Sequence, residues 1–255
     1  NTATDASGQS SSCIFTITVR DDENPVLTCP GNLVLPTDPG QCSRSNVTFS
    51  VTATDNFAVT NLTSVPPSGS SFPLGTTTVT NTATDSSGNV SACTFTVTIR
   101  DSENPVIACP SNLVLNADAG QCSRSNVTFA VNATDNCSVT NLTVVPPSGS
   151  TFPVGVTTVT GTATDSSGNT ASCTFTVTVR DTQNPVITCP TNLVLTADIG
   201  RCSRSNVTFL VTATDNCGVT NLVSVPPSGS TFPVGITTVT STATDGSGNQ
   251  SSCSF

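Results

Sequence analysis

The stretch TTVTGTATDSSGNTASCTFTVTV, residues 157–179, decides the fold class of this chain. On either side of the polar segment Asp165–Asn169, polar residues, mostly threonine, alternate with small or apolar ones. This period-two alternation is typical of half-buried β-strands, and Asp-Ser-Ser-Gly-Asn is typical of a turn. The stretch therefore predicts strands at about 157–164 and 173–179, separated by a turn.

The residues around this stretch extend the same pattern. Further strands are predicted at Leu113–Leu115, Asn126–Val131 and Val139–Val145. Clusters of glycine, proline, serine and aspartate between them predict turns at 117–120 and 146–150. No stretch combines helical spacing with helix-forming residues. Many short strands with regular turns indicate an antiparallel β-sandwich.

This segment is repeated along the chain. Residues 101–175 align with residues 181–255 without a gap, and 57 of these 75 positions are identical. We therefore predict an all-β protein of tandem sandwich domains in an extended array. The expected domains are 1–20 (the end of a preceding repeat), 21–100, 101–180 and 181–255, the last with a truncated final strand. We expect the chain to be a segment of a longer array.

The composition argues against several functions. The chain has no histidine, lysine, tryptophan or tyrosine, and its net charge is −9. It lacks the basic surface that nucleic acids and anionic membranes require. It also has no apolar run long enough to insert into a membrane. Because general acid–base and nucleophilic groups are missing or occur in every repeat, we predict that the protein is not an enzyme.

Twelve cysteines recur at fixed positions in the repeats. No CxxC pair and no histidine occurs, which argues against zinc. Small domains with several cysteines each are typical of disulfide-bonded extracellular proteins. The predicted localisation is therefore extracellular, either secreted or on the cell surface.

Several motifs together resemble the HYR (hyalin repeat) domain. In residues 101–180 they are NPVIACP, ATDN, TFPVG, ATDSSGN and CTF, which begin at Asn104, Ala133, Thr151, Ala163 and Cys173. The resemblance covers nearly the whole chain. It implies an immunoglobulin-like β-sandwich of extracellular and cell-surface proteins, linked to adhesion and without catalytic activity. It also implies disulfides between the cysteine before proline and the cysteine that opens the last strand: Cys29–Cys93, Cys109–Cys173 and Cys189–Cys253.

The other cysteines leave two pairings open. Bonds Cys42–Cys137 and Cys122–Cys217 would clamp successive repeats together. Bonds Cys122–Cys137 and Cys202–Cys217 would instead close a loop within each repeat. The first repeat has Phe57 where a within-repeat partner of Cys42 is expected, which favours the clamp slightly.

Acidic residues recur where each repeat begins. In a sandwich of this topology, Asp135 and Asp165 are expected near the incoming linker, which carries Asp101 and Glu103. The equivalent residues are Asp21, Glu23, Asp55 and Asp85 in the first repeat, and Asp181, Gln183, Asp215 and Asp245 in the third. Clustered oxygen ligands predict a Ca²⁺ site at each junction. The alternative is that the aspartates only cap tight turns. No other cofactor is expected.

Asparagines in Asn-x-Ser/Thr sequences are candidates for N-glycosylation. Asn46, Asn126 and Asn206 occupy equivalent positions, and the further candidates are Asn61, Asn141 and Asn132. A glycan coat would cover exposed sheet edges.

The preferred functional hypothesis is a structural one. Tandem repeats joined by short proline-containing linkers would build an extracellular fibre, filament or stalk, with neighbouring repeats or identical chains as partners. The alternative is a cell-adhesion module that binds glycans or a surface receptor. The absence of tryptophan and tyrosine disfavours the alternative. Among the phenylalanines, Phe57 is a candidate contact residue, whereas Phe72, Phe152 and Phe232 are expected to fill the core.

Overall fold

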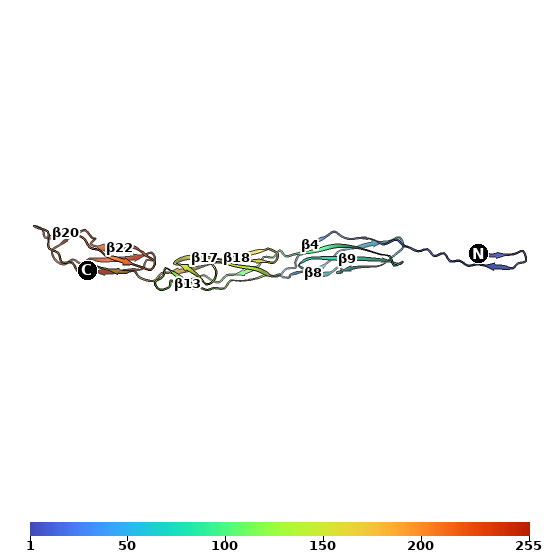
Figure 1. Cartoon of the computed structure of the whole chain (residues 1–255), viewed down its shortest axis with the longest axis horizontal. Helices are drawn as coiled ribbons and strands as arrows, with labels where there is room; N and C mark the ends of the chain where they lie inside the picture. Colours follow the sequence, from blue (N-terminus) through green and yellow to red (C-terminus); the bar gives the residue numbers. More distant parts are fainter. The chain divides into compact units, whose positions relative to one another are not determined.

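The computed structural model describes all 255 residues and contains only strands and connecting segments (Figure 1). It has no helix of the length and apolar character that a membrane crossing requires. The chain divides into two compact units, Asn1–Glu103 and Asn104–Phe255. The predicted all-β fold class is thus confirmed.

The first unit contains a short hairpin and one complete repeat. The hairpin pairs β1 with β2. In the repeat, a four-stranded sheet has the order β4-β10-β9-β7, and two further pairs join β3 with β6 and β5 with β8. The strands are β1 (Thr2–Thr4), β2 (Ser10–Ser12), β3 (Val26–Thr28), β4 (Leu33–Pro36), β5 (Ser43–Val47), β6 (Thr52–Thr54), β7 (Val59–Val65), β8 (Ser70–Pro73), β9 (Gly75–Asp85) and β10 (Val90–Arg100).

The second unit contains two repeats. The first has the strand arrangement of the repeat in the first unit, whereas the second lacks the edge strand that β4 forms there. The sheets of this unit have the orders β12-β18-β17-β15 and β22-β24-β25, with two-stranded pairs beside each. The strands of its first repeat are β11 (Val106–Ala108), β12 (Leu113–Asn116), β13 (Ser123–Val127), β14 (Asn132–Thr134), β15 (Val139–Val145), β16 (Ser150–Pro153), β17 (Gly155–Asp165) and β18 (Thr170–Arg180). Those of its second are β19 (Val186–Thr188), β20 (Ser203–Val207), β21 (Thr212–Thr214), β22 (Val219–Val225), β23 (Ser230–Pro233), β24 (Thr240–Asp245) and β25 (Gln250–Ser254).

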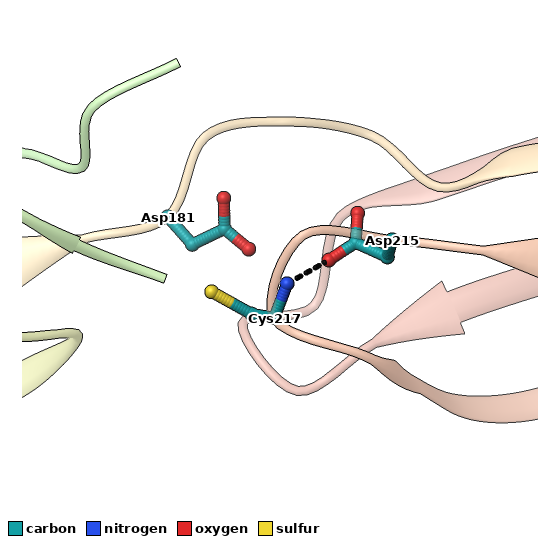
Figure 2. Close-up of side chains that lie close together, drawn as sticks. All are labelled: Asp181, Asp215 and Cys217. Carbon is teal, nitrogen blue, oxygen red and sulfur yellow. Dashed lines mark hydrogen bonds between the residues drawn. The ribbon is translucent and has the colours of Figure 1, made fainter. Parts of the chain in front are cut away.

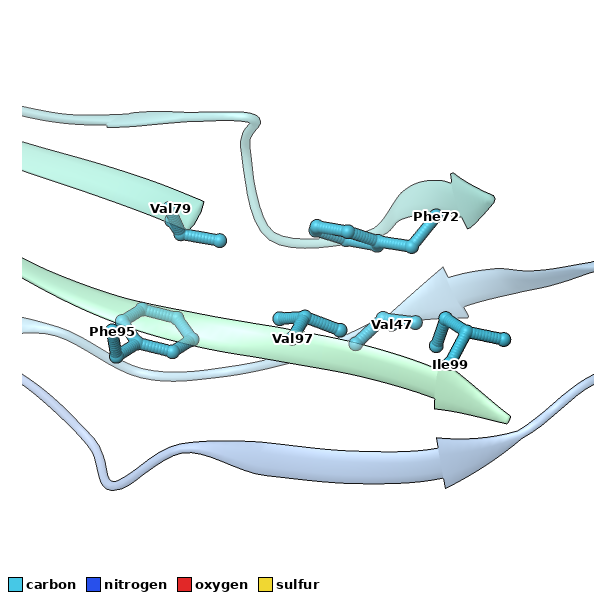
Figure 3. Close-up of a cluster of buried hydrophobic side chains, with 6 residues drawn as sticks. All are labelled: Val47, Phe72, Val79, Phe95, Val97 and Ile99. Carbon is cyan, nitrogen blue, oxygen red and sulfur yellow. The ribbon is translucent and has the colours of Figure 1, made fainter. Parts of the chain in front are cut away.

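Alternation along the two longest strands builds the core. In β9 and β10 the inward positions are buried, and the outward threonines face water. The core of the first repeat contains Val79 from β9, Phe95, Val97 and Ile99 from β10, and Val47 and Phe72 from the facing pair β5–β8 (Figure 3). The predicted sandwich is therefore confirmed, with one parallel pairing, β4 with β10, among its antiparallel ones.

One local feature differs from the sequence prediction. The strand expected at Asn126–Val131 stops at Val127, because Asn126 adopts a left-handed conformation (φ 50°) and a register shift separates Arg124 from Val127. In the third repeat β25 ends at Ser254. A groove in this repeat is lined in part by Leu193, Phe209 and Phe232.

Candidate functional site

One disulfide closes each complete repeat. Cys29–Cys93, Cys109–Cys173 and Cys189–Cys253 have Cα–Cα distances of 6.3, 5.9 and 5.9 Å. Each closes 64 residues of sequence and joins the segment after the first strand to the last strand. The covalent bond lies beside the core, where Cys29 and Cys109 pack against the buried clusters.

Another disulfide joins the second repeat to the third. Cys122 and Cys217 are bonded, with a Cα–Cα distance of 4.8 Å and a sequence separation of 95. Cys202 is a free, exposed thiol. The within-repeat alternatives Cys122–Cys137 and Cys202–Cys217 therefore do not occur in this structure, since Cys217 is already bonded to Cys122. The corresponding bond of the preceding repeat, Cys42–Cys137, stays a prediction.

Acidic side chains converge beside this disulfide (Figure 2). One carboxylate oxygen each of Asp181 and Asp215, and the Sγ of Cys217, lie within 4.8 Å of one another. Asp215 is held by the backbone N–H of Cys217, at 2.8 Å. Because Cys217 is in a disulfide, its sulfur is not a thiolate ligand. Oxygen atoms are left as the available ligands.

Asp181 is the most enclosed member of this group. Its side chain is 5% exposed. Oδ1 accepts hydrogen bonds from the Gln183 N–H and the Asn216 amide, both at 3.1 Å, whereas Oδ2 is buried without a partner. The Oδ1 of Asn216 is also buried without a partner. An unpartnered buried carboxylate oxygen is costly, unless a cation or water satisfies it.

The first repeat repeats the arrangement within its own unit. Carboxylate oxygens of Asp21, Asp55 and Asp85 lie within 4.8 Å of one another. The Oδ2 atoms of Asp21 and Asp55 are buried without partners. Asn56 donates to Asp21 Oδ1 at 3.3 Å, as Asn216 donates to Asp181. The structure thus brings together three of the four residues expected in this group; the fourth, Glu23, lines a small pocket with Asp55 and Asn56.

Asp85, Asp165 and Asp245 have a different primary role, because each organises the turn that follows it. Asp165 accepts from the backbone N–H groups of Ser167 and Asn169, both at 2.8 Å, and from the Asn169 amide at 2.7 Å. Burial of Asp165 opposes its ionisation, but these hydrogen bonds outweigh burial and lower its pKa. The turn-capping alternative therefore describes the contacts of these aspartates, and in the first repeat Asp85 also belongs to the acidic group.

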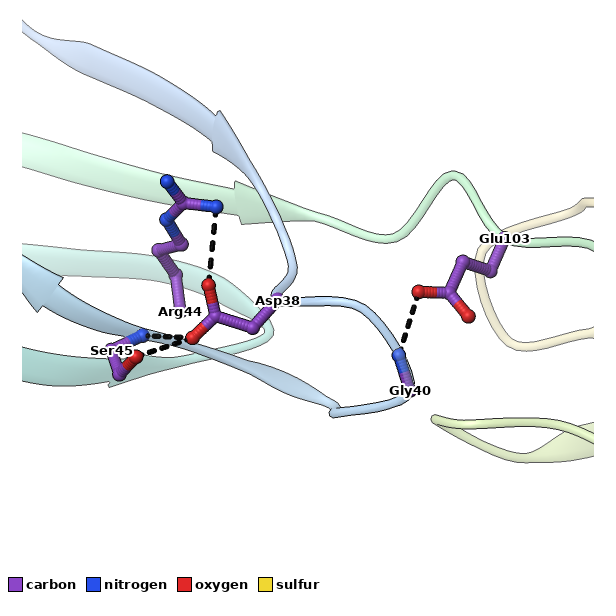
Figure 4. A network of polar contacts seen from close by, with 5 residues as sticks. All are labelled: Asp38, Gly40, Arg44, Ser45 and Glu103. Atoms are coloured by element: carbon purple, nitrogen blue, oxygen red, sulfur yellow. Dashed lines mark hydrogen bonds and ion pairs between the residues drawn. The ribbon is translucent and has the colours of Figure 1, made fainter.

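Glu103 makes a hydrogen bond that its position in the sequence did not predict. Its Oε1 accepts a hydrogen bond from the backbone N–H of Gly40, at 2.9 Å, in the loop that follows β4 (Figure 4). In the third repeat's linker, Gln183 Oε1 accepts from Gly120 at 3.2 Å. A glutamine oxygen replaces a glutamate oxygen in the same bond, so this contact is kept in both linkers. Asp101 belongs to the first unit, which ends at Glu103, and Asp135 and Asp165 belong to the second.

An aspartate network in the same loop was missed by sequence reasoning. Asp38 accepts from the side chain and backbone of Ser45 and forms an ion pair with Arg44 at 3.1 Å (Figure 4). The Ser45 side chain, the Ser45 N–H and Arg44 lower the pKa of Asp38 against partial burial. Asp118 and Asp198 repeat these contacts. The spacing Asp-x₅-Arg-Ser, present in all three repeats, was the available signal.

The glycosylation candidates are all exposed. Asn46, Asn126 and Asn206 have φ angles of 51°, 50° and 51° beside the register shift, and their side chains face solvent. Asn61, Asn141 and Asn132 are exposed on strands. Of the phenylalanines, Phe72 and Phe152 are 1% exposed, Phe232 is half-buried beside the open groove, and Phe57 is 70% exposed.

These features define a class of protein: tandem β-sandwich repeats, each closed by its own disulfide, with a further disulfide between the second and third. The HYR domain profile matches residues 20–99, 100–179 and 180–255, and the chain belongs to this family. The resemblance inferred from the sequence motifs is thereby confirmed.

Two curated relatives are similar over almost the whole chain. Hyalin of Strongylocentrotus purpuratus is 38% identical over 264 residues, and hyalin of Lytechinus variegatus is 39% identical over 265 residues. Both alignments cover 98% of this chain, but only 22% and 50% of the two hyalins. Among solved structures, human CDH23 EC21-23 is 17% identical with a TM-score of 0.35, covering 91% of this chain and 99% of that one.

Proposed function

We propose that this chain is part of an extracellular structural array built from HYR repeats. The observation that carries the proposal is the Cys122–Cys217 disulfide, which ties the second repeat covalently to the third. A bond of this kind restricts rotation at the junction, and near-identical repeats propagate the same geometry along a chain.

The array proposal is tested by imaging the purified chain by negative-stain electron microscopy. We expect rods of uniform curvature, and fewer of them after Cys122→Ser/Cys217→Ser substitution. Randomly bent beads in the parent protein would refute a stiff array. The adhesion alternative predicts instead that beads coated with the chain aggregate or bind cells; soluble chain should compete for that binding.

Nothing in the chemistry of the repeats supports catalysis. The chain has no histidine or lysine, and the clustered carboxylates are buried or partly buried. We therefore propose a non-enzymatic role, outside the cell, where disulfides persist. Glycosylation at Asn46, Asn126 and Asn206 belongs to the same proposal; an intact mass equal to the sequence mass, from a eukaryotic secretory host, would exclude it.

We also propose that the acidic group at the start of a repeat binds Ca²⁺. The supporting observation is Asp181 Oδ2, buried and unpartnered beside Asp215 and Asn216. Asp181, Asp215 and Asn216 would hold the ion in the third repeat, and Asp21, Asp55 and Asp85 in the first. Calcium prefers such oxygen ligands, and the bound ion would neutralise the buried negative charge.

The calcium proposal is tested by thermal unfolding in EGTA and in millimolar Ca²⁺. A ligand that binds only the folded state raises its stability as the ligand concentration rises above Kd. We expect a higher Tm in Ca²⁺ and a smaller rise in the variants Asp181→Asn and Asp21→Asn. Identical Tm values in both buffers would refute the proposal.

A further inference from the structure

The junction disulfide and the acidic group share their neighbouring residues. Cys122 follows Gln121, and Cys217 follows Asn216. The Asn216 amide donates to the Gln121 carbonyl oxygen at 2.9 Å. The disulfide and this hydrogen bond are therefore consecutive links between the same two segments, one from the second repeat and one from the third.

Asn216 connects these two links to Asp181. Its Nδ2 donates to Asp181 Oδ1, at 3.1 Å, as well as to Gln121. With both amide hydrogens engaged, the orientation of the amide is fixed, and its Oδ1 remains buried without a partner. Figure 2 shows the Asp181 carboxylate directed toward the loop that carries Asp215 and Cys217. The disulfide thus holds Asn216, whose unpartnered Oδ1 is a further candidate oxygen ligand because its amide is bonded to Asp181.

We infer that the Cys122–Cys217 disulfide controls the Ca²⁺ affinity of the third-repeat site by fixing Asn216 between Gln121 and Asp181. The inference rests on the proposed calcium binding and adds its regulation. Without the covalent link, the Asn216 loop moves relative to Gln121. Aligning its Oδ1 and Asp215 then costs conformational entropy when the ion binds. With the disulfide in place, Asn216 and Asp215 are already ordered before the ion binds.

The first repeat provides a comparison within the same chain. Its acidic group has the homologous asparagine, Asn56, bonded to Asp21. The next residue is Phe57, which is exposed and cannot form a disulfide. We therefore expect its Ca²⁺ affinity to be independent of any change at Cys122 or Cys217.

Isothermal titration of the whole chain with CaCl₂ tests the inference. The binding heat that is present in the parent chain and absent in the Asp181→Asn variant identifies the third-repeat site. In the Cys122→Ser/Cys217→Ser variant we expect the affinity of that site to fall by about 5- to 150-fold, the usual range of coupling between two sites. The first-repeat site should keep its affinity. Cys202→Ser is the matched control, because Cys202 occupies the position of Cys122 in its repeat but is free.

A reciprocal measurement on the unmutated chain covers the case in which the double variant misfolds. Dithiothreitol gives two electrons and two protons to the bond, leaving two thiols and the cyclic disulfide of the reagent. At equilibrium, Ca²⁺ should favour the Cys122–Cys217 bond by the factor by which the bond favours Ca²⁺. Alkylation and mass spectrometry of the peptides containing Cys122 and Cys217 measure the reduced fraction of this bond with and without Ca²⁺, with Asp181→Asn as the control.

The outcomes separate the inference from the proposal beneath it. No Ca²⁺ heat at all in the parent chain would overturn both. Equal affinity of the third-repeat site with and without the disulfide, or a reduction equilibrium that Ca²⁺ does not move, would overturn the coupling alone and leave calcium binding in place.

Discussion

Asp165 shows how one side chain determines a local structure. Its carboxylate accepts two backbone N–H groups and one amide from the next four residues, and Gly168 supplies the left-handed residue of the turn at φ 91°. The ATDSSGN motif could therefore be read as a turn from sequence, because all its partners lie within four residues. In every repeat, an aspartate at this position organises the turn in the same way.

Asp165→Ala should destabilise the second repeat. The substitution leaves the N–H groups of Ser167 and Asn169 without their acceptor and removes a charge-assisted bond. We expect the Tm of that repeat to fall by roughly 5–15 °C, measured by calorimetry. Ser166→Ala is the control, because the Ser166 side chain is exposed and has no recorded bond; an equal loss in both variants would contradict the assigned role.

Acid should weaken the fold through the same aspartates. The pKa values of Asp165 and Asp118 lie below the ordinary value of 3.8: in Asp165 the turn hydrogen bonds outweigh burial, and in Asp118 the Ser125 side chain is the largest cause. A folded pKa below the unfolded one stabilises the protein above about pH 4, and this stability is lost as pH falls through the folded pKa. Urea midpoints should be constant from pH 7 to 5 and fall between pH 4 and 2. In the Asp165→Asn variant, the urea midpoint should fall less between pH 4 and 2.

The residues that the sequence could not place are those with distant partners. Glu103 contacts Gly40 across 63 positions, and Asn216 contacts Gln121 across 95. A residue's type and spacing do not reveal such partners. Hence Glu103 was expected in the acidic group, whereas the contacts of Asn216 with Asp181 and Gln121 were not foreseen at all.

At the scale of elements, the long strands were predictable and the short ones less so. β17 and β18 alternate over eleven residues each, enough to identify both the strand and its buried face. β13 is only five residues long and ends beside Asn126 in a left-handed conformation. The parallel pairing of β12 with β18 joins residues 64 apart, and local patterning does not encode it.

Phe152 should be essential to the core that these elements form. It lies on β16, is 1% exposed, and contacts the ring of Phe129 with a centroid distance of 6.4 Å. Phe152→Ala removes a buried aromatic ring, and we expect a loss of about 3–5 kcal/mol in unfolding free energy of that repeat. Chemical denaturation measures this. Phe57→Ala, at a 70% exposed position, should change stability by less than about 0.5 kcal/mol.

On the scale of the whole molecule, the repeat period predicted that the three repeats share a fold, because each copy carries the same alternating sequence pattern. The pairing of the remaining cysteines was left open by the sequence, since both alternatives satisfied the spacing. The structure joins Cys122 to Cys217, so the second and third repeats are linked by a peptide linker, a disulfide, and the bonds of Asn216 and Gln183.

These links should make the second and third repeats unfold together. In a linear array, stability is the sum of each repeat's own stability and the interface terms between neighbours. A strong interface term merges two transitions into one, and a weak term separates them. Calorimetry of the parent chain should therefore show one transition for the two repeats, with a calorimetric enthalpy matching the van't Hoff value for the pair. The Cys122→Ser/Cys217→Ser variant should show two transitions, whereas Cys202→Ser should behave as the parent. Two separate transitions in the parent would mean that the disulfide tethers the repeats without coupling their folding.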